Sequence, residues 1–415
     1  MILASSPSLP IDFVRTQFPA LDEYGTFLDN AGGTQMLQSV INRVMDYWLT
    51  SNVQLGGSYP LSLQASDRFN AAIEDLAGFI KVTDPSSLVL GGSASLLFRI
   101  LAHCLAQTWQ AGDEVIVTNC DHEANISPWM DLQRQGIVIK TWCVDPDSFC
   151  LRVEDLEPLL SDRTRLVAFT HASNILGTIN PLEEIVKLAH DRGVQVCVDG
   201  VGYAPHRCLS LDEWDVDFYI FSFYKLFGSR QSVLYGKQAL LEALPGFNHH
   251  FIHTVPQKFQ PGGCSYDLTY GNVGICDYFQ ELGEQVGCIG KTFEESIAEC
   301  FDLIASHEAE LTDRLLTFLQ KYPQVRIIGC PEAEASVRVA TIAFVVEGQS
   351  SQWIPDRLAE KNIGIRYGDF YAKRLIEDWN LTEQNGVIRV SLVHYNTLEE
   401  VDRLIEHLTP LLVDR

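Results

Sequence analysis

Basic residues are scarce in this chain of 415 residues, which carries 30 Lys and Arg against 54 Asp and Glu. The formal net charge is therefore −24. A strongly acidic protein is repelled by nucleic acid and by anionic membrane surfaces, because both are polyanions. We therefore expect neither of them as a partner, and the charge by itself says little about a small substrate.

Long apolar runs and paired cysteines are also lacking. No stretch approaches the length needed to cross a bilayer. The opening MILASSPSLPIDFVRTQFPAL has no basic segment and no sustained apolar core, so we expect no signal peptide. The 11 cysteines include no C-x-x-C pair, which indicates reduced thiols in a cytoplasmic protein. The cluster of His249, His250 and His253 lacks a carboxylate or cysteine to complete a metal site, so we expect no metal.

The central feature of the sequence is the stretch from Val194 to Gly228. Two short apolar runs, rich in β-branched and aromatic residues, end in Asp199 and in Ser222, and Lys225 follows three residues later. Such runs are typical of strands buried on both faces of a parallel sheet. The carboxyl ends of parallel strands form the edge at which ligands bind, so we expect Asp199 and Lys225 to face one bound molecule.

An amine and a carboxylate at this edge are the groups that pyridoxal phosphate (PLP) requires. Lys225 would form the Schiff base, and Asp199 would keep the pyridine nitrogen protonated. An ordinary surface lysine and a strand-end aspartate are the alternative. Ser222-x-x-Lys225 also matches a motif of penicillin-binding enzymes, but no S-D-N or K-T-G element accompanies it, which excludes that interpretation.

A phosphate site is predicted where the strand Ser87 to Leu90 runs into Gly91-Gly92-Ser93-Ala94-Ser95 and the helical pattern LLFRILAHCLA. A glycine and serine turn before a helix exposes backbone N–H groups and hydroxyls at the positive end of the helix. The turn lacks the Walker lysine and the full G-x-G-x-x-G. An ordinary helix cap therefore stays open as the alternative.

Three further polar residues are placed at or inside strands. His122 could stack on a planar cofactor or move protons, or simply cap a helix. Asn174 could reach a cofactor oxygen or form a turn. Arg389 lies within an apolar strand, where a guanidinium is costly unless it meets an anion, either a substrate carboxylate or an internal acidic partner.

Strands and helices alternate from about Ser87 to Tyr235, which predicts an α/β fold with a mostly parallel sheet. Beyond about residue 245 the pattern changes to long helices and a second α+β unit. The content of 46% hydrophobic residues is sufficient for a large core. We therefore expect two domains within one folding unit.

Several motifs together carry a resemblance to a known family. They are FLDNAGG (27–33), DEVIVTNCDHEANISPW (113–129), THASNILGTINPLEEI (170–185), VCVDG (196–200), DFYIFSFYKLFG (217–228) and IRVSLVHYNTLEEVDRL (388–404). The chain resembles the class V aminotransferases, which are PLP enzymes of fold type I, and within them the cysteine desulfurase-like branch.

The resemblance implies an N-terminal arm (1–25) packing with the small domain, a large PLP-binding domain (26–285) with a mostly parallel seven-stranded sheet, and a small C-terminal α+β domain (286–415). It also implies a homodimer with active sites at the interface, in which the loop from Gly262 to Cys264 lies near the partner's cofactor. The implied reaction is on an amino acid, through an external aldimine and an α-carbanion.

The resemblance also implies roles for individual residues. Lys225 and His122 would be catalytic, with His122 stacked on the cofactor ring, and Asp199 would face the pyridine nitrogen. Asn174 would lie near the phenolic oxygen, and Arg389 and Asn30 would bind the substrate. Ser93, Ser95, Ser222 and Tyr224 would surround the phosphate, and Ala94 would also bind the cofactor.

Three departures from the family pattern bear on the reaction. Cysteine desulfurases take up sulfur on a cysteine before the last strand, but residues 365–379 contain none and the last cysteine is Cys330. Gly202 stands where Gln or His is often found, and Gly263 stands where a threonine from the partner subunit usually contacts the phosphate. We therefore expect C–S lyase chemistry by β-elimination from an amino acid such as cysteine or cystine. The alternatives are a class V aminotransferase or epimerase, and a catalytically impaired PLP-fold binding protein.

Overall fold

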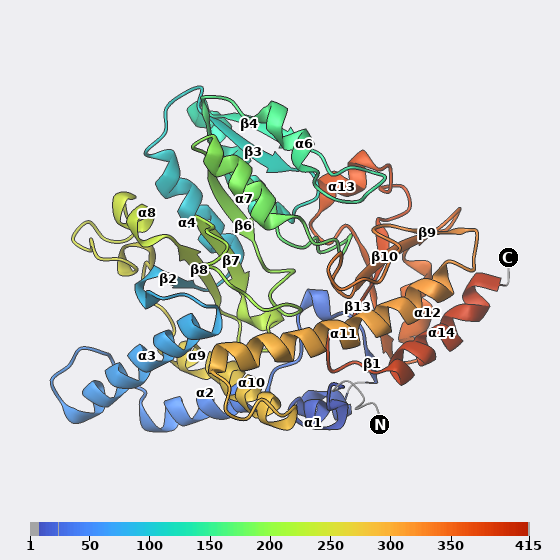
Figure 1. Ribbon diagram of the computed structural model, residues 1–415, viewed down its shortest axis with the longest axis horizontal. Helices are drawn as coiled ribbons and strands as arrows, with labels where there is room; N and C mark the ends of the chain where they lie inside the picture. The colour runs from blue at the N-terminus through green and yellow to red at the C-terminus, as the bar shows by residue number, and fades with distance from the viewer. Residues whose placement is uncertain (1–7, 24, 414–415) are drawn as a thin grey trace.

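The structure, a computed structural model, describes residues 8–23 and 25–413. Figure 1 shows a unit built on a large sheet and a second, C-terminal unit beside it. Within the described residues no helix is both long enough and apolar enough to cross a membrane.

The large sheet has seven strands in the order β2-β8-β7-β6-β5-β3-β4. These are β2 (Leu88–Gly91), β3 (Glu114–Thr118), β4 (Val138–Trp142), β5 (Thr164–Thr170), β6 (Gln195–Asp199), β7 (Phe218–Ser222) and β8 (Ser232–Gly236). β8 runs antiparallel to both of its neighbours, and the other pairs are parallel. The prediction of a mostly parallel, seven-stranded α/β sheet is confirmed.

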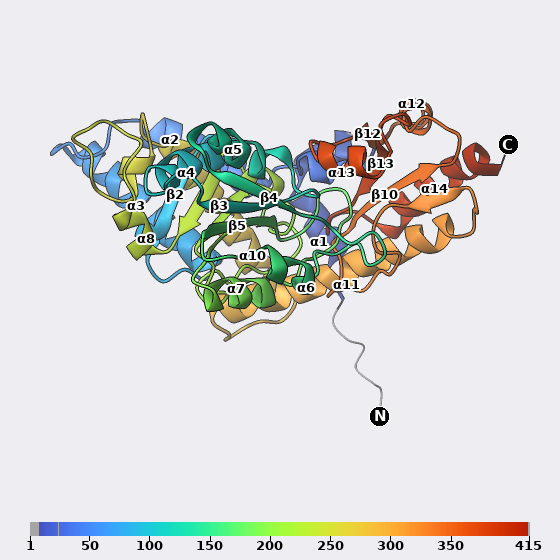
Figure 2. The same ribbon diagram turned by 90° about the horizontal axis from the view of Figure 1, so that it is seen from above.

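Both faces of this sheet are covered, as Figure 2 shows. On one side α4 (Ala94–Ala106) and α5 (Ser127–Met130) lie over the strands, and on the other α6 (Val153–Leu156), α7 (Leu182–Asp191) and α10 (Gly274–Gln285) lie under them. Successive strand residues point to opposite faces. Val196 and Val198 accordingly join the core under α7, and Cys197 joins the core under α4. The apolar runs of the sequence are therefore buried on both faces.

The C-terminal unit is built on an antiparallel four-stranded sheet in the order β12-β13-β10-β9. Its elements are β9 (Val325–Ile327), β10 (Thr341–Val346), α12 (Trp353–Ala359), β12 (Arg366–Gly368), α13 (Lys373–Asp378), β13 (Val387–Ser391) and α14 (Leu398–Val413). A separate parallel pair joins β1 (Thr26–Phe27) to β11 (Ile363–Gly364). β1, which the sequence analysis grouped with the large domain, thus pairs with a strand of the C-terminal segment.

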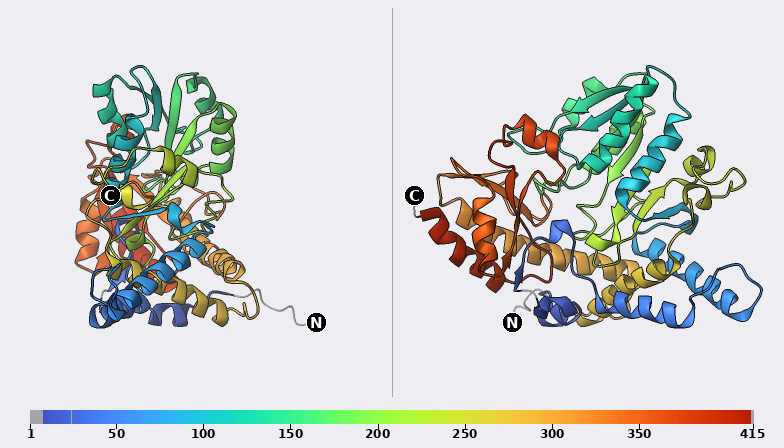
Figure 3. Two further views of the ribbon diagram at one scale, coloured as in Figure 1. Left: turned by 90° about the vertical axis from the view of Figure 1, so that its left-hand side faces the viewer. Right: turned by 180° about the vertical axis from the view of Figure 1, so that it is seen from behind.

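One long helix, α11 (Phe293–Leu319), runs beneath both units (Figures 1 and 3). Its first half, including Ile297 and Ile304, packs into the core of the large unit. Its second half, including Leu311 and Leu319, packs into the core of the C-terminal unit. The helix therefore connects the two hydrophobic cores directly.

The N-terminal segment crosses from one unit to the other. In α1 (Ile11–Thr16), Arg15 donates to the carbonyl of Tyr395 at 2.8 Å. Phe18 packs against Tyr395 and, edge to face, against Phe227 of the large unit, with ring centroids 4.7 and 5.6 Å apart. Three helices then pack together beside the sheet, namely α2 (Gln38–Thr50), α3 (Pro60–Phe79) and α9 (Tyr266–Asn272).

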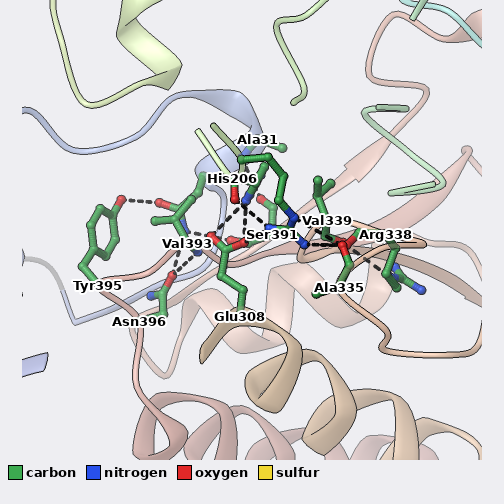
Figure 4. A network of polar contacts seen from close by, with 12 residues as sticks. Ala31, His206, Glu308, Ala335, Arg338, Val339, Ser391, Val393, Tyr395 and Asn396 are labelled. Atoms are coloured by element: carbon green, nitrogen blue, oxygen red, sulfur yellow. Dashed lines mark hydrogen bonds and ion pairs between the residues drawn. The ribbon is translucent and has the colours of Figure 1, made fainter. Parts of the chain in front are cut away.

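A buried ionic cluster connects the segment after β6 to α11 (Figure 4). Both carboxylate oxygens of Glu308 lie 3.0 Å from the His206 Nδ1, and Arg207 donates to the same carboxylate at 3.2 Å. Arg207 also donates at 2.9 Å to the backbone carbonyls of Ala335 and Arg338. Glu308 is 1% exposed, so its charge depends on these partners for stabilisation.

We predict that Glu308→Ala lowers the free energy of unfolding by roughly 3 kcal/mol, because it leaves the buried His206 and the partly buried Arg207 without their carboxylate. Chemical denaturation measures this change. Glu310→Ala, at an exposed position of the same helix, is the matched control and should change stability by no more than about 0.5 kcal/mol. Equal effects of the two variants would contradict a stabilising role of the cluster.

Candidate active site

Two adjoining cavities open at the carboxyl ends of β6 and β7. The inner cavity is lined by Ser93, Ala94, Ser95, His122, Ala124, Thr170, Ala172, Asn174, Asp199, Val201, Gly202, Ser222, Tyr224 and Lys225. The outer cavity shares His122, Asn174, Tyr224 and Lys225 and adds Ala31, Gly32, Arg366, Tyr367, Gly368, Asp369, Phe370, Tyr371 and Arg389. The candidate residues of the sequence therefore meet here, with the exception of Asn30.

A larger hollow of about 740 Å³ lies between α10 and the start of α11. It is remote from the strand ends, and its lysine, Lys291, pairs with Glu299 at the surface. The amine and carboxylate of the sequence prediction meet only in the inner cavity, which we therefore take as the candidate site.

The Lys225 side chain is 9% exposed, and burial, with the nearby Arg389 guanidinium, lowers its pKa to about 8. Asp199 accepts a hydrogen bond from the Val201 N–H at 2.9 Å. Burial raises the pKa of Asp199 to about 6, against the opposing effects of that bond and of Lys225. At neutral pH the carboxylate is thus mostly ionised, and a fraction of the amine is already neutral.

His122 begins a 3-10 turn, Glu123–Asn125, and its Nδ1 accepts the Ala124 N–H at 3.0 Å. Burial, Lys225 and Arg389 lower its pKa to about 4, so the ring is neutral at pH 7. The preceding Asp121 is fully buried and accepts from Asn125 at 2.7 Å and from the Thr170 N–H at 3.0 Å. Asp121 therefore holds the turn of His122 against the end of β5, a role that the sequence did not reveal.

The N-terminus of α4 forms one end of the inner cavity. Ser93 caps the helix by accepting the Leu96 N–H at 3.2 Å, so the helix-cap alternative is realised at this residue. Ala94 and Ser95 still present their backbone N–H groups at the positive end of the helix. On the facing strands, the hydroxyls of Ser222 and Ser232 lie 2.7 Å apart.

Arg389 is 2% exposed and has an internal acidic partner, Asp29, whose Oδ1 accepts from it at 3.1 Å. It also donates to the Asn174 carbonyl at 3.1 Å. Burial lowers its pKa to about 10, so it stays charged. Arg389 therefore has an internal acidic partner, and it also lines the outer cavity.

Asn30 lies outside both cavities. Its buried amide donates to the Ser391 carbonyl at 2.8 Å and to the Asn396 side chain at 3.0 Å, and its oxygen accepts from Tyr395. These bonds fix the segment after β1 against the end of β13. Asn30 can therefore place the lining residues Ala31 and Gly32 without touching a ligand in this arrangement.

Comparisons with known proteins show which family has this sequence pattern and fold. A family model described as Aminotransferase class-V matches residues 26–280 and 289–404. The chain belongs to the class V aminotransferase family.

Two relatives and one solved structure show how far the similarity extends. The chain is 40% identical to aminotransferase-like protein FGM3 of Gibberella zeae, over 98% of this chain and 100% of that one. It is 33% identical to cysteine desulfurase-like protein ustD of Aspergillus flavus, over 95% and 88%. The crystal structure of the cysteine desulfurase CsdA of Escherichia coli superposes with a TM-score of 0.83 at 26% identity, covering 97% of this chain and 99% of that one.

Membership of class V makes this chain a PLP-dependent enzyme of fold type I. The groups in the inner cavity fit the cofactor. An anion site at the start of α4 suits a phosphate, a mostly ionised aspartate suits a protonated ring nitrogen, and a partly neutral lysine suits an aldehyde.

The presence of glycine at position 202, one of the departures from the class V pattern, has a steric explanation. A Cβ at this position would lie 2.4 Å from the backbone carbonyl oxygen of Ala172. The loop after β5 therefore approaches too closely for a larger residue. The glutamine or histidine usual in this class could return only if that loop moved.

The segment 366–371 lines the outer cavity, although the sequence drew attention to residues 365–379 only for their lack of cysteine. Phe370 and Tyr371 both have positive φ angles, +49° and +61°. Consecutive left-handed residues that are neither Gly nor Asn are unexpected from sequence. The ring of Tyr371 lies 5.0 Å from that of His122.

We predict that cofactor-free protein binds PLP at a rate that rises about tenfold per pH unit below pH 8 and levels off above it, because only the neutral Lys225 amine attacks an aldehyde. The growth of the Schiff-base absorbance band measures the rate, and Lys225→Ala should form no band. A rate that keeps rising to pH 10 would indicate an ordinary, solvated lysine and contradict the lowered pKa.

Proposed function

We propose that this enzyme cleaves the C–S bond of a sulfur-containing amino acid, such as cysteine or cystine, by β-elimination. The names of two of the similar proteins, a cysteine desulfurase-like protein and a cysteine desulfurase, support this substrate class. With cysteine the products would be pyruvate, ammonia and hydrogen sulfide. One water molecule is consumed, and no oxidant is required.

The observation that carries the proposal is the absence of a thiol at the site. No cysteine is among the described residues that line the two cavities, and no cysteine follows Cys330 in the sequence. Cys264 lines neither cavity of its own chain, and burial raises the pKa of its thiol to about 11, so it would stay a neutral thiol even where a second copy brings it near the cofactor. Transfer of sulfur to an enzyme thiol requires a thiolate near the substrate. Sulfur would therefore leave as a free product.

Each residue of the site has a role in this proposal. PLP, when bound, withdraws electrons from the Cα of the substrate. Lys225 would anchor the cofactor and move the proton at Cα, and Asp199 would hold a proton on the pyridine nitrogen. The neutral ring of His122 would cover one face of the cofactor, and the Arg389 guanidinium would bind the substrate carboxylate.

Further residues would hold the cofactor itself. The N-terminus of α4 with Ser93, Ala94 and Ser95, together with Ser222 and Tyr224, would hold the phosphate. Asn174 would lie near the phenolic oxygen. The Asn174 side-chain N–H donates to the Phe370 carbonyl at 2.8 Å, which leaves its other N–H for a ligand.

Amino transfer is the second candidate function. The relative at 40% identity is named an aminotransferase-like protein, and the same lysine could move the proton from Cα to the cofactor carbon. The two reactions differ in their products, because amino transfer yields a keto acid that retains sulfur.

We predict that the PLP-loaded enzyme converts cysteine into equal amounts of pyruvate and sulfide, and that Lys225→Ala slows this roughly 1,000-fold or more, because it removes the group that moves the proton. Colorimetric pyruvate and sulfide assays measure both products. Lys187→Ala, at an exposed ion pair with Asp191, is the matched control. A sulfur-containing keto acid without free sulfide would reject elimination and support amino transfer.

We also propose that the enzyme is a homodimer. Large apolar side chains are exposed on α2, on α3 and its preceding loop, at the start of α4, and in the loop after α8 (Gln238–Ala243). They are Met45, Trp48, Leu49, Tyr59, Leu61, Leu63, Leu96, Phe247 and Phe251. Gly262 and Gly263 have left-handed φ angles and open space around them. A second copy could cover these side chains and bring the Gly262–Cys264 loop near its cofactor.

We predict a mass in solution of twice the 46.5 kDa of the chain, measured by light scattering. A double variant, Trp48→Glu with Leu49→Glu, should yield monomers, because it places charges in an apolar contact. Val413→Glu also alters an exposed apolar residue, the last of α14, a helix at the opposite end of the molecule from α3 (Figure 1), and should stay dimeric. A monomeric wild type would contradict the proposal.

A further inference from the structure

The Arg389 guanidinium is held by three different groups. One edge donates to the Asn174 carbonyl and another to Asp29, both at 3.1 Å. The ring of Phe370 covers its face, with the guanidinium carbon 3.7 Å from the ring centroid. This is a close cation–π contact at a desolvated site, where such contacts are strongest.

Two of the five N–H groups of Arg389 have acceptors among the described residues, and its Nε has none. Its Nε–H is buried and makes no hydrogen bond within residues 8–23 and 25–413. A buried donor without an acceptor is unfavourable unless a ligand or water supplies one. The guanidinium therefore has capacity for a further acceptor, in a cavity that it shares with Lys225.

The backbone around Phe370 is fixed in a strained shape. Both Phe370 and Tyr371 are left-handed, and such strain persists only where the surroundings enforce it. The Asn174 side chain donates to the Phe370 carbonyl at 2.8 Å, and the Glu123 N–H donates to the Tyr371 carbonyl at 2.8 Å. Asn174 thus contacts both partners, Phe370 through its amide and Arg389 through its carbonyl.

A second guanidinium, that of Arg366, lies close to Arg389 and makes its position less favourable. β12 and β13 place Arg366 directly opposite Arg389, and like charges in that arrangement repel. The Phe370 ring lies near both, 5.8 Å from the guanidinium carbon of Arg366. Asp29 pairs with both guanidinium groups. Its carboxylate lies 3.1 Å from Arg389 and 3.8 Å from Arg366.

We propose that Phe370 is a positioning residue, which holds the face of the Arg389 guanidinium so that its remaining N–H groups meet the substrate carboxylate. This inference rests on the role of Arg389 in the proposed function. Without the ring, the guanidinium can give more of its N–H groups to Asp29 or become hydrated, and either change weakens its binding of the substrate. Phe370 itself need not touch the reacting atoms.

The test is a spectral titration of the PLP-loaded enzyme, in its own oligomeric state in solution, with L-alanine and with ethylamine. The two probes differ by the carboxylate, and neither can undergo β-elimination. The spectrum is read immediately after mixing, before amino transfer from L-alanine could convert the cofactor, so the result does not depend on which reaction the enzyme catalyses. Phe370→Leu should raise the Kd of L-alanine about 10-fold, as expected for the loss of a desolvated cation–π contact. The Kd of ethylamine and the spectrum without amine should stay unchanged.

Three further variants complete the design. Phe370→Tyr keeps the aromatic face and should bind L-alanine like the wild type. Phe344→Leu removes the same atoms from the core of the C-terminal unit, on the face of the sheet opposite to Arg389, and should leave both Kd values unchanged. In an Arg389→Lys background, Phe370→Leu should add little, because the two residues act through one contact.

The outcomes separate this inference from the proposed function. If Arg389→Lys weakens L-alanine binding and Phe370→Leu does not, the positioning role of Phe370 is wrong while the role of Arg389 stands. An equal loss for L-alanine and ethylamine in Phe370→Leu, or fully additive effects of the two substitutions, would also overturn it. If Arg389→Lys has no effect on L-alanine, the carboxylate-binding role of Arg389 fails, and this inference fails with it.

Discussion

The burial of Lys225 and Arg389 together at the end of one sheet is the constraint on which the site depends. Burial lowers the pKa of both groups, and a neighbouring cation lowers each further, Arg389 for Lys225 and Arg366 for Arg389. Asp199 and Asp29 offset part of the cost, and Asn174 and Phe370 hold the guanidinium in place. The site therefore suits two anions, a phosphate at the start of α4 and a carboxylate at Arg389.

The architecture brings these groups together from distant parts of the chain. β6 and β7 deliver Asp199 and Lys225 from the large unit, and β13 delivers Arg389 from the C-terminal unit. The relative position of the units is maintained by α11, by the cluster around Glu308, and by the bonds of Asn30. None of these residues lines the two cavities, yet each helps to determine whether the two halves of the site meet.

The sequence predicted the buried strands well, because an apolar run ending in a polar residue is a local signal. It therefore placed Asp199, Ser222 and Lys225 at one sheet edge. It could not predict the pairing of β1 with β11, which joins Thr26 to Ile363 over two residues without any local pattern. It also missed α9, whose sequence YDLTYGN has low helix propensity and is held by packing on α2. The left-handed Phe370 and Tyr371 depend on tertiary contacts alone.

Reduction of the PLP-loaded protein with borohydride, followed by mass spectrometry of its peptides, tests the central claim most directly. Borohydride converts a lysine Schiff base into a stable amine and so records which lysine holds the cofactor. The account predicts a pyridoxyl group on Lys225. Attachment at any other lysine, or no attachment after PLP has been supplied, would contradict it.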